Sequence, residues 1–198
     1  MDNIYPVSAN EVLSKSNKLN GVIWYTGLSG SGKSTSADLL SKKLNSMNIQ
    51  NIWLDGDNLR SGINSDLGFS DEDRIENLRR TVEVAKLFFN LGYIVIVSTI
   101  SPFKASRDFA RNNFPSNKFI EVFMKCDLKV CAQRDSKSLY KKANEGKVRN
   151  FTGITSTFEE PINSEVVLNS STQNTEINHL KLFKAFCVFF KINVHELS

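Results

Sequence analysis

With 198 residues and a hydrophobic fraction of 40%, the chain is long enough and apolar enough to form one globular domain with a buried core. The formal net charge is +4 without any block of five like charges, so a nucleic-acid surface is not required and an anionic small molecule fits equally well. No apolar run approaches the about 20 residues that a membrane-spanning helix needs. We expect a small-molecule partner, and neither nucleic acid nor a membrane.

The cysteines and the start of the chain bear on the compartment. Cys126, Cys131 and Cys187 are odd in number and lack metal-ligand spacing, which argues against a disulfide framework or a zinc site. The first ten residues, MDNIYPVSAN, have neither the basic nor the continuous apolar region of a targeting signal. We expect a cytoplasmic protein whose cysteines are buried as small hydrophobic residues.

Strand and helix patterns alternate after a polar segment, residues 1–20, that we expect to be peripheral. The predicted strands cover 22–26, 51–55, 93–100, 119–125 and 165–169. The first predicted helix begins near Lys33, and the others cover 71–90, 103–112, 128–134 and 175–190. Continuously apolar strands between helices are typical of parallel sheets covered on both faces. We predict an α/β fold, doubly wound around a mainly parallel five-stranded sheet, in a single domain 1–198 with ligands beyond the carboxyl ends of the strands.

The segment GLSGSGKST follows the first strand and precedes the first helix. Its pattern Gly-x-x-x-x-Gly-Lys-Ser is typical of a phosphate cradle, in which backbone N–H groups surround a phosphate chain, the lysine reaches the terminal phosphates and the serine hydroxyl ligates Mg²⁺. The alternative is a flexible turn between core elements. The cradle residues are Gly27, Leu28, Ser29, Gly30, Ser31, Gly32, Lys33, Ser34 and Thr35.

Two further strand ends carry polar residues. The second strand runs into DGDNLR, whose two carboxylates and one guanidinium could serve as metal ligand, general base and anion clamp. Equally, Asp57 could cap a short helical turn. After the third strand, Ser101 could bind a phosphate or sulfate oxygen or accept a phosphoryl group, or it could be the N-cap of the helix that begins at Phe103.

The long helix 71–90 has a predicted capping box of Ser70 with Asp73. Its predicted apolar stripe consists of Ile75, Leu78, Val82, Ala85 and Phe89. At about 100° per residue, three polar side chains lie along the edge of that stripe, where they can line a pocket: Arg74, Asn77 and Thr81. We expect Arg79 and Arg80 to lie on a solvated basic face.

The last third of the chain contains a basic segment and an apolar tail. Residues 134–153 hold Tyr140, Phe151 and several lysines, which predicts either a lid that closes over transferring phosphates or a solvated loop with an aromatic anchor. The tail 172–198 reads as a docked helix or a dimer contact without a catalytic signal. Its apolar residues at helical spacing are Ile177, Leu180, Phe183, Cys187 and Phe190.

Together these motifs resemble the adenylylsulfate (APS) kinases over residues 21–169. The resemblance is carried by the ordered motifs GLSGSGKST, DGDNLR, LGFSDEDRIENLRR, VSTISP, RDSKSLYKKA and FTGI. It implies a P-loop kinase fold, a homodimer, and transfer of the γ-phosphoryl group of ATP, with Mg²⁺, to the ribose 3′-hydroxyl of adenosine 5′-phosphosulfate.

The resemblance also implies residue roles. Lys33 and the loop backbone bind ATP, Ser34 binds Mg²⁺, and Asp57 is the base or the organiser of the metal site. The acceptor is held by Arg60, Arg74, Asn77, Ile100 and Ser101, its adenine is sandwiched between Phe69 and Phe151, and Lys141 belongs to the lid. Ser101 matches a serine described in the family as a phosphorylated intermediate. Direct transfer needs no covalent step, so the alternative is that Ser101 binds the substrate without being phosphorylated.

Several positions depart from the family pattern. Ser61 stands where a histidine is usual, Phe103-Lys104 replaces Tyr-Arg, and Thr99 stands where an aromatic residue is frequent. Lysine lacks the bidentate fork of arginine, so these changes affect the acceptor half. One alternative is therefore a kinase for another anionic nucleotide, such as cytidine diphosphoramidate. A second alternative is a nucleotide-binding regulatory module. The acceptor-side residues argue against it, because such a module needs no second substrate pocket.

Overall fold

The computed structural model describes residues 19–135, 138–146 and 150–192. Five parallel strands form one sheet in the order β2-β3-β1-β4-β5, which confirms the predicted doubly wound α/β architecture. The strands are β1 (Gly21–Thr26), β2 (Asn51–Asp55), β3 (Ile94–Ser98), β4 (Phe119–Lys125) and β5 (Val166–Asn169).

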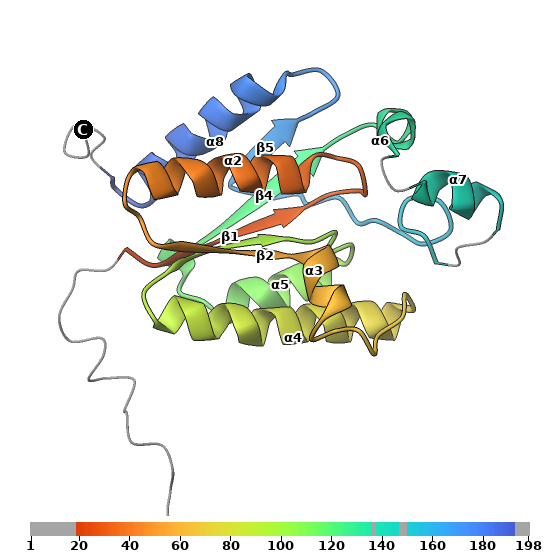
Figure 1. Ribbon diagram of the computed structural model, residues 1–198, viewed down its shortest axis with the longest axis horizontal. Helices are drawn as coiled ribbons and strands as arrows, with labels where there is room; N and C mark the ends of the chain where they lie inside the picture. The colour runs from red at the N-terminus through yellow and green to blue at the C-terminus, as the bar shows by residue number, and fades with distance from the viewer. Residues whose placement is uncertain (1–18, 136–137, 147–149, 193–198) are drawn as a thin grey trace, which may run out of the picture.

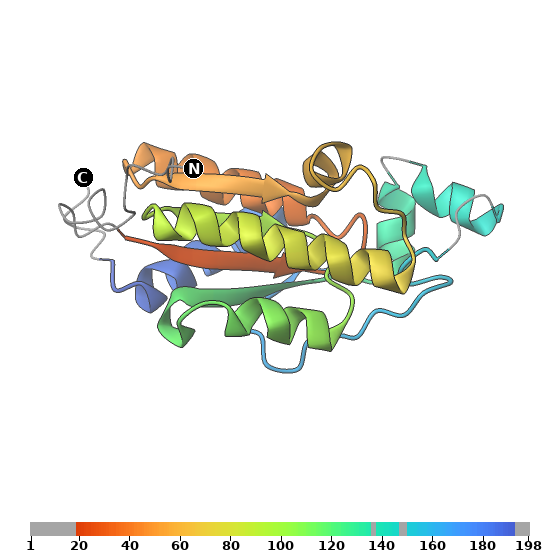
Figure 2. The same ribbon diagram turned by 90° about the horizontal axis from the view of Figure 1, so that it is seen from below.

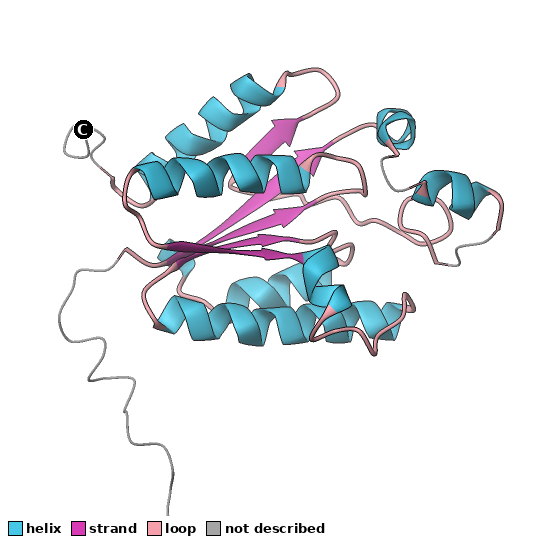
Figure 3. Cartoon of the chain, in the orientation of Figure 1, coloured by secondary structure: helices cyan, strands magenta, loops and turns pink. Residues whose placement is uncertain are grey.

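Helices cover both faces of the sheet (Figure 1). α2 (Lys33–Ser46) and α8 (Thr175–Phe189) lie on one face, and α4 (Asp71–Asn90) and α5 (Lys104–Asn112) lie on the other, as the turned view also shows (Figure 2). The short elements are α3 (Gly56–Ser61), η1 (Ser116–Lys118), α6 (Leu128–Arg134) and α7 (Leu139–Asn144). Of these, α3, α6 and α7 gather where the strand arrows end (Figure 3). α3 and α7 were not predicted.

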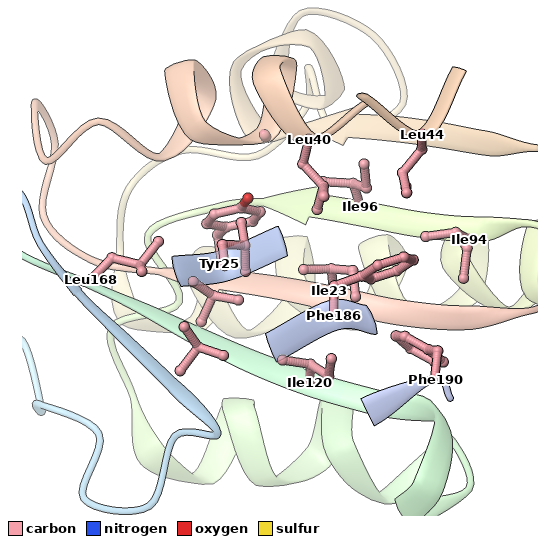
Figure 4. Close-up of a cluster of buried hydrophobic side chains, with 14 of the residues drawn as sticks. Ile23, Tyr25, Leu40, Leu44, Ile94, Ile96, Ile120, Leu168, Phe186 and Phe190 are labelled. Carbon is pink, nitrogen blue, oxygen red and sulfur yellow. The ribbon is translucent and has the colours of Figure 1, made fainter. Parts of the chain in front are cut away.

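The core explains why the inner strands are apolar throughout. Every residue of β1 and β3 is buried because helices cover both sides of the sheet. The cluster under α2 and α8 includes Leu40, Phe186 and Phe190, which meet Ile23 and Ile120 of the sheet (Figure 4). A second cluster, centred on Trp24, Val82 and Phe119, fills the space under α4 and α5.

Helix α4 is longer than the sheet that it covers, and this corrects the predicted stripe. Its 20 residues span about 30 Å, whereas the five residues of β3 span about 17 Å. The predicted Ser70–Asp73 capping box is present, and Leu78, Val82 and Ala85 are buried as predicted. Ile75, however, is 52% exposed, because the first turns of α4 extend past the carboxyl edge of the sheet.

Two other burial predictions were wrong in part. In α8 the buried side chains at four-residue spacing are Asn178, Leu182 and Phe186, so Ile177 and Leu180 lie beside that row and are exposed. Cys131 and Cys187 are buried as predicted, but Cys126 is only half-buried, since it follows the carboxyl end of β4.

No helix within the described parts of the chain is long and apolar enough to cross a membrane. The predicted peripheral segment lies almost entirely outside the described residues, as do parts of the predicted lid and the end of the tail.

Phe186→Ala tests the contribution of the α8 face to the core. Because Phe186 is fully buried, its truncation should lower the free energy of unfolding by about 3–5 kcal/mol. Val188→Ala on the same helix is the control, since Val188 is 80% exposed and should change stability by less than about 0.5 kcal/mol. Urea denaturation measures both. Equal losses would contradict the docking of α8 through Phe186.

Candidate active site

A cleft of about 1210 Å³ lies along the carboxyl edge of the sheet. Its walls come from the phosphate loop, α3, the start of α4, the segment after β3, the Phe151 loop and the first turn of α8. Parallel pairing places this edge: Asp55 and Tyr25 are both in register with Ser98, so three strands end together. Doubly wound sheets bind ligands at such edges.

The phosphate loop has the backbone shape that its glycines predict. Gly27, Gly30 and Gly32 have φ values of 147°, 75° and 93°, which side-chain-bearing residues rarely adopt. At Gly30 an added Cβ would also lie 2.9 Å from the carbonyl oxygen of Cys131. No side chain caps α2 at Gly32. The first backbone N–H groups of α2 therefore face this end of the cleft, as an anion-binding site requires.

Lys33 is held inside the curve of this loop. Its ammonium donates to the carbonyl oxygens of Gly27 at 2.9 Å and Leu28 at 2.7 Å, and the residue is only 8% exposed. The positive charge and the N-terminus of α2 therefore act from the same place. This arrangement fits a chain of phosphates as ligand.

Asp55, at the end of β2, connects three elements of the site. Its Oδ2 accepts hydrogen bonds from Ser34 Oγ at 2.9 Å and from Ser98 Oγ at 2.8 Å. Its Oδ1 accepts the backbone N–H groups of Asp57 at 3.0 Å and Asn58 at 3.4 Å. Asp55, not Asp57, is thus the N-cap of α3, which corrects the helix-cap interpretation of Asp57 and leaves that side chain at the cleft wall.

The residues around Asp55 fit a magnesium ion. Mg²⁺ prefers oxygen ligands, commonly one or two protein groups together with phosphate oxygens and water. The Ser34 hydroxyl and the Asp55 carboxylate lie within 2.9 Å of each other at the start of α2, which supplies this donor set. Within the described residues there is no group of three or more His, Cys, Asp or Glu side chains that could hold a metal by themselves.

The other end of the cleft is positively charged. The Arg60 and Arg74 guanidinium groups lie 4.6 Å and 5.8 Å from the centre of the Phe69 ring. Burial lowers the pKa of both groups from the ordinary arginine value, which expresses the cost of desolvating a cation. Arginine keeps its charge in proteins, so these partly desolvated cations favour an anionic ligand.

Arg74 also joins the two predicted aromatic partners. Its Nε donates to the carbonyl oxygen of Phe69 at 3.2 Å, and its Nη2 donates to that of Asn150, the neighbour of Phe151. Phe69 is 53% exposed, whereas Phe151 is buried with its ring at 4.9 Å from that of Tyr140. Both phenylalanines line the cleft, which is consistent with the predicted sandwich but does not test it.

Ser101 lies in a tightly held turn after β3. Its φ is 44°, and its hydroxyl accepts the indole N–H of Trp24 at 3.0 Å and shares a 2.5 Å hydrogen bond with Thr99. Arg107 donates to the Ser101 carbonyl oxygen at 2.9 Å. The N-cap interpretation of Ser101 was wrong: α5 begins at Lys104, whose N–H is bound by the carboxylate of Glu159.

The predicted lid is partly helical and contacts the phosphate loop. Tyr140 of α7 donates its hydroxyl to the Ser29 carbonyl oxygen at 2.8 Å, and Arg134 approaches that of Gly30 at 3.4 Å. Lys141 is exposed, and the described residues that line the cleft do not include it. Its predicted role in closure remains a prediction. Residues 136–137 and 147–149 lie outside the described residues.

The sequence offered Asp55 only as one of the two DGDNLR carboxylates that could serve as metal ligand or general base, and its capping of α3 and its hydrogen bonds to Ser34 and Ser98 were not predicted. Arg107 and Asn64 were also missed, because no sequence pattern marks the hydrogen bonds that they make to the Ser101 turn and to Asn77. Arg79 pairs with Glu76 and is exposed, in agreement with the predicted solvated face. Arg80 also pairs with Glu76 but is half-buried, because it binds Asp66 and the Ile63 carbonyl oxygen of the loop before α4.

This fold, with its phosphate loop at one end of a cleft and cations at the other, defines a P-loop kinase. Residues 20–169 match the sequence pattern of the adenylylsulphate kinase family. The chain is 50% identical over 176 residues to the adenylyl-sulfate kinase of Bacillus pumilus, covering 89% of each protein. It is 49% identical over 163 residues to a probable adenylyl-sulfate kinase of Halalkalibacterium halodurans, covering 82% of this chain and 81% of that protein.

A solved structure agrees with this. The Mycobacterium tuberculosis APS kinase in complex with AMPPNP and APS matches with a TM-score of 0.80 and 41% identity, covering 85% of this chain and 98% of that chain. The chain belongs to the adenylyl-sulfate kinase family. It is therefore a kinase, as predicted, and not a regulatory module.

Gly30→Ala tests the phosphate loop. The added methyl group would meet the Cys131 carbonyl oxygen in a backbone conformation that alanine disfavours, so the loop must shift and kcat/KM for ATP should fall about 100-fold. Gly92→Ala is the matched control, since Gly92 also has a positive φ, 88°, but lies between α4 and β3 at the far edge of the sheet. Similar losses of kcat/KM in both variants would contradict the role of Gly30.

Proposed function

We propose that this kinase transfers the γ-phosphoryl group of ATP to the ribose 3′-hydroxyl of adenosine 5′-phosphosulfate, giving 3′-phosphoadenylyl sulfate and ADP. The observation that carries the proposal is one continuous cleft with an anion-binding loop at one end and Arg60 and Arg74 at the other. The family membership and the relative solved with AMPPNP and APS support the same pair of substrates. Two nucleotides in these positions would meet near Asp57.

Phosphoryl transfer requires in-line positioning and neutralisation of charge more than covalent chemistry. The backbone N–H groups of residues 27–35 and the Lys33 ammonium would hold the β- and γ-phosphates. Ser34 and Asp55 would hold Mg²⁺, which supplies charge neutralisation on the phosphate oxygens when bound. Asp57, on the first turn of α3, would orient the acceptor hydroxyl and take its proton.

The acceptor nucleotide would occupy the cationic end. Arg60, Arg74 and Asn77 would hold its phosphosulfate and ribose, and the rings of Phe69 and Phe151 would bind its adenine between them. Ile100 and Ser101 would form the wall of the cleft beneath it. The α7 segment would complete the donor side through Tyr140 and its contact with Ser29.

One observation keeps a second acceptor open. Thr99, where the family frequently has an aromatic residue, lies in the cleft wall bonded to Ser101. A smaller polar side chain there changes the shape of the acceptor site, which would suit another anionic nucleotide such as cytidine diphosphoramidate. Comparing kcat/KM for the two acceptors separates these functions.

We also propose that the protein acts in the cytoplasm, in sulfate activation, as a homodimer. The family membership supports a role in sulfate activation. It also supports the cytoplasm, because ATP and the adenosine 5′-phosphosulfate that an ATP sulfurylase type of reaction supplies would be drawn from the same compartment. The exposed apolar residues Ile177 and Leu180, each 53% exposed, support an association surface on α8.

Asp57→Asn tests the assigned reaction. The purified wild-type protein should release ADP only when adenosine 5′-phosphosulfate and MgATP are both present, and the variant should lose about 100-fold or more in kcat because the amide cannot take the proton. A coupled ADP-release assay measures this. Asp38→Asn, which alters an exposed ion pair with Lys42 on α2, is the control. No turnover by the wild type would refute the acceptor, and full activity of Asp57→Asn would refute the base.

Ser101→Ala distinguishes a phosphoserine intermediate from a substrate-binding turn. The hydroxyl is already bonded to Trp24 and Thr99, neither of which is a base, so we expect kcat at saturating acceptor to stay near the wild-type value while the acceptor KM rises. Lys33→Ala should instead reduce transition-state stabilisation by about 3 kcal/mol or more. A loss of kcat in Ser101→Ala as large as that in Lys33→Ala would support a covalent step through the Ser101 hydroxyl.

A further inference from the structure

A pair of buried asparagines connects the loop after α3 with the acceptor end of the cleft. Asn64, which is completely buried, donates a hydrogen bond from Nδ2 to the Oδ1 atom of Asn77 at 3.0 Å. Asn77 lies on α4 and lines the cleft, whereas Asn64 stands behind it. The loop and the first turns of α4 lie side by side at the end of the sheet (Figure 1).

The direction of this hydrogen bond determines what Asn77 offers to a ligand. A side-chain amide has one carbonyl oxygen and one NH₂ group, and these lie on opposite sides of the carboxamide. Because the oxygen of Asn77 is occupied by Asn64, its NH₂ group is the one left for the cleft. With the guanidinium groups of Arg60 and Arg74, the acceptor end then presents three hydrogen-bond donor groups, which suit phosphate, sulfate or ribose oxygens.

Asn64 is fixed by its own backbone. Its N–H donates to the Leu59 carbonyl oxygen at 2.9 Å, and its carbonyl oxygen accepts the N–H of Leu67 at 3.1 Å. Its side-chain oxygen has no hydrogen-bond partner among the described residues. Burying an oxygen without a hydrogen-bond partner lowers stability. The orientation of the Asn64 carboxamide that has this cost is also the one that directs its N–H at Asn77.

We propose that Asn64 is a positioning residue that fixes the polarity of Asn77, so that Asn77 presents N–H donors and not its carbonyl oxygen to the acceptor nucleotide. This inference rests on the proposed function for the identity of that nucleotide. Asn64 itself touches neither substrate. It acts only through the carboxamide of Asn77.

Asn64→Asp tests the proposal with a side chain of the same size. An ionised carboxylate can only accept, so at a pH above the pKa of the introduced group the Asn77 amide must turn over to donate to it and must expose its oxygen to the anionic acceptor. Losing one hydrogen bond to a charged group should raise the KM for adenosine 5′-phosphosulfate at least about tenfold, with little change in the KM for ATP. Asn64→Leu, which removes the donor without adding a charge, should raise the same KM to a smaller extent.

Two comparisons separate positioning from a general structural role. In an Asn77→Ala background, Asn64→Asp should have no further effect on the acceptor KM, since its target is gone. Arg80→Gln is the matched control, because Arg80 ties the same loop to α4 from outside through the Ile63 carbonyl oxygen and Asp66, without contacting the Asn77 side chain. Additive effects in the double variant, or an equal rise of KM in Arg80→Gln, would overturn the proposal.

A spectroscopic measurement tests the polarity whatever the acceptor is. In ¹⁵N-labelled full-length protein, the side-chain NH₂ signals of Asn64 and Asn77 are assigned by their loss in Asn64→Asp and Asn77→Ala. In the wild type a hydrogen-bonded, downfield-shifted proton should belong to Asn64, and in Asn64→Asp one should appear on Asn77. A downfield proton on Asn77 in the wild type would overturn the proposal. A wild-type enzyme inactive with adenosine 5′-phosphosulfate would refute the proposed function but not this inference.

Discussion

The carboxylate of Asp55 ties the phosphate loop to the two strands beside it, and the geometry of the whole cleft depends on this interaction. One oxygen binds the hydroxyls of Ser34 and Ser98, and the other caps α3. The start of α2, the end of β3 and the direction of α3 are therefore fixed relative to one another. α3 then carries Asp57 and Arg60 into the space between the two ends of the cleft.

The cationic end of the cleft, with Arg60 and Arg74, depends on a difference in length between α4 and the sheet. The buried middle of α4 anchors the helix on the sheet, and its first turns extend beyond the edge with Arg74 and Asn77 directed into the cleft. At this end of the cleft Arg60 of α3 donates to the Gly68 carbonyl oxygen at 2.7 Å, which joins α3 to the loop that leads into α4. A helix that ended with the sheet would leave the cleft without these donors.

The turn around Ser101 shows how one wall of the cleft is held by the core behind it. Arg107 is almost completely buried and lies 3.7 Å from Glu121 of β4 while it binds the carbonyl oxygens of the turn. The partnered charge makes burial of the guanidinium tolerable, and the hydrogen bonds keep Ser101 in a left-handed conformation. The backbone conformation of Ser101 is thus supported by a buried ion pair between α5 and β4.

The amino-acid sequence by itself determined the fold and the backbone shape of the phosphate loop. Apolar runs such as β1 and β4, and the spacing of Gly27, Gly32 and Lys33, are local patterns, so α/β architecture and the phosphate loop could be predicted closely. The exposure of Ile75, the hydrogen bonds of Asp55 to Ser34 and Ser98, and the Asn64–Asn77 pair were decided only by tertiary structure. The first depends on how far α4 extends past the sheet and the others on which side chains meet in space, and periodicity along one segment carries no information about either.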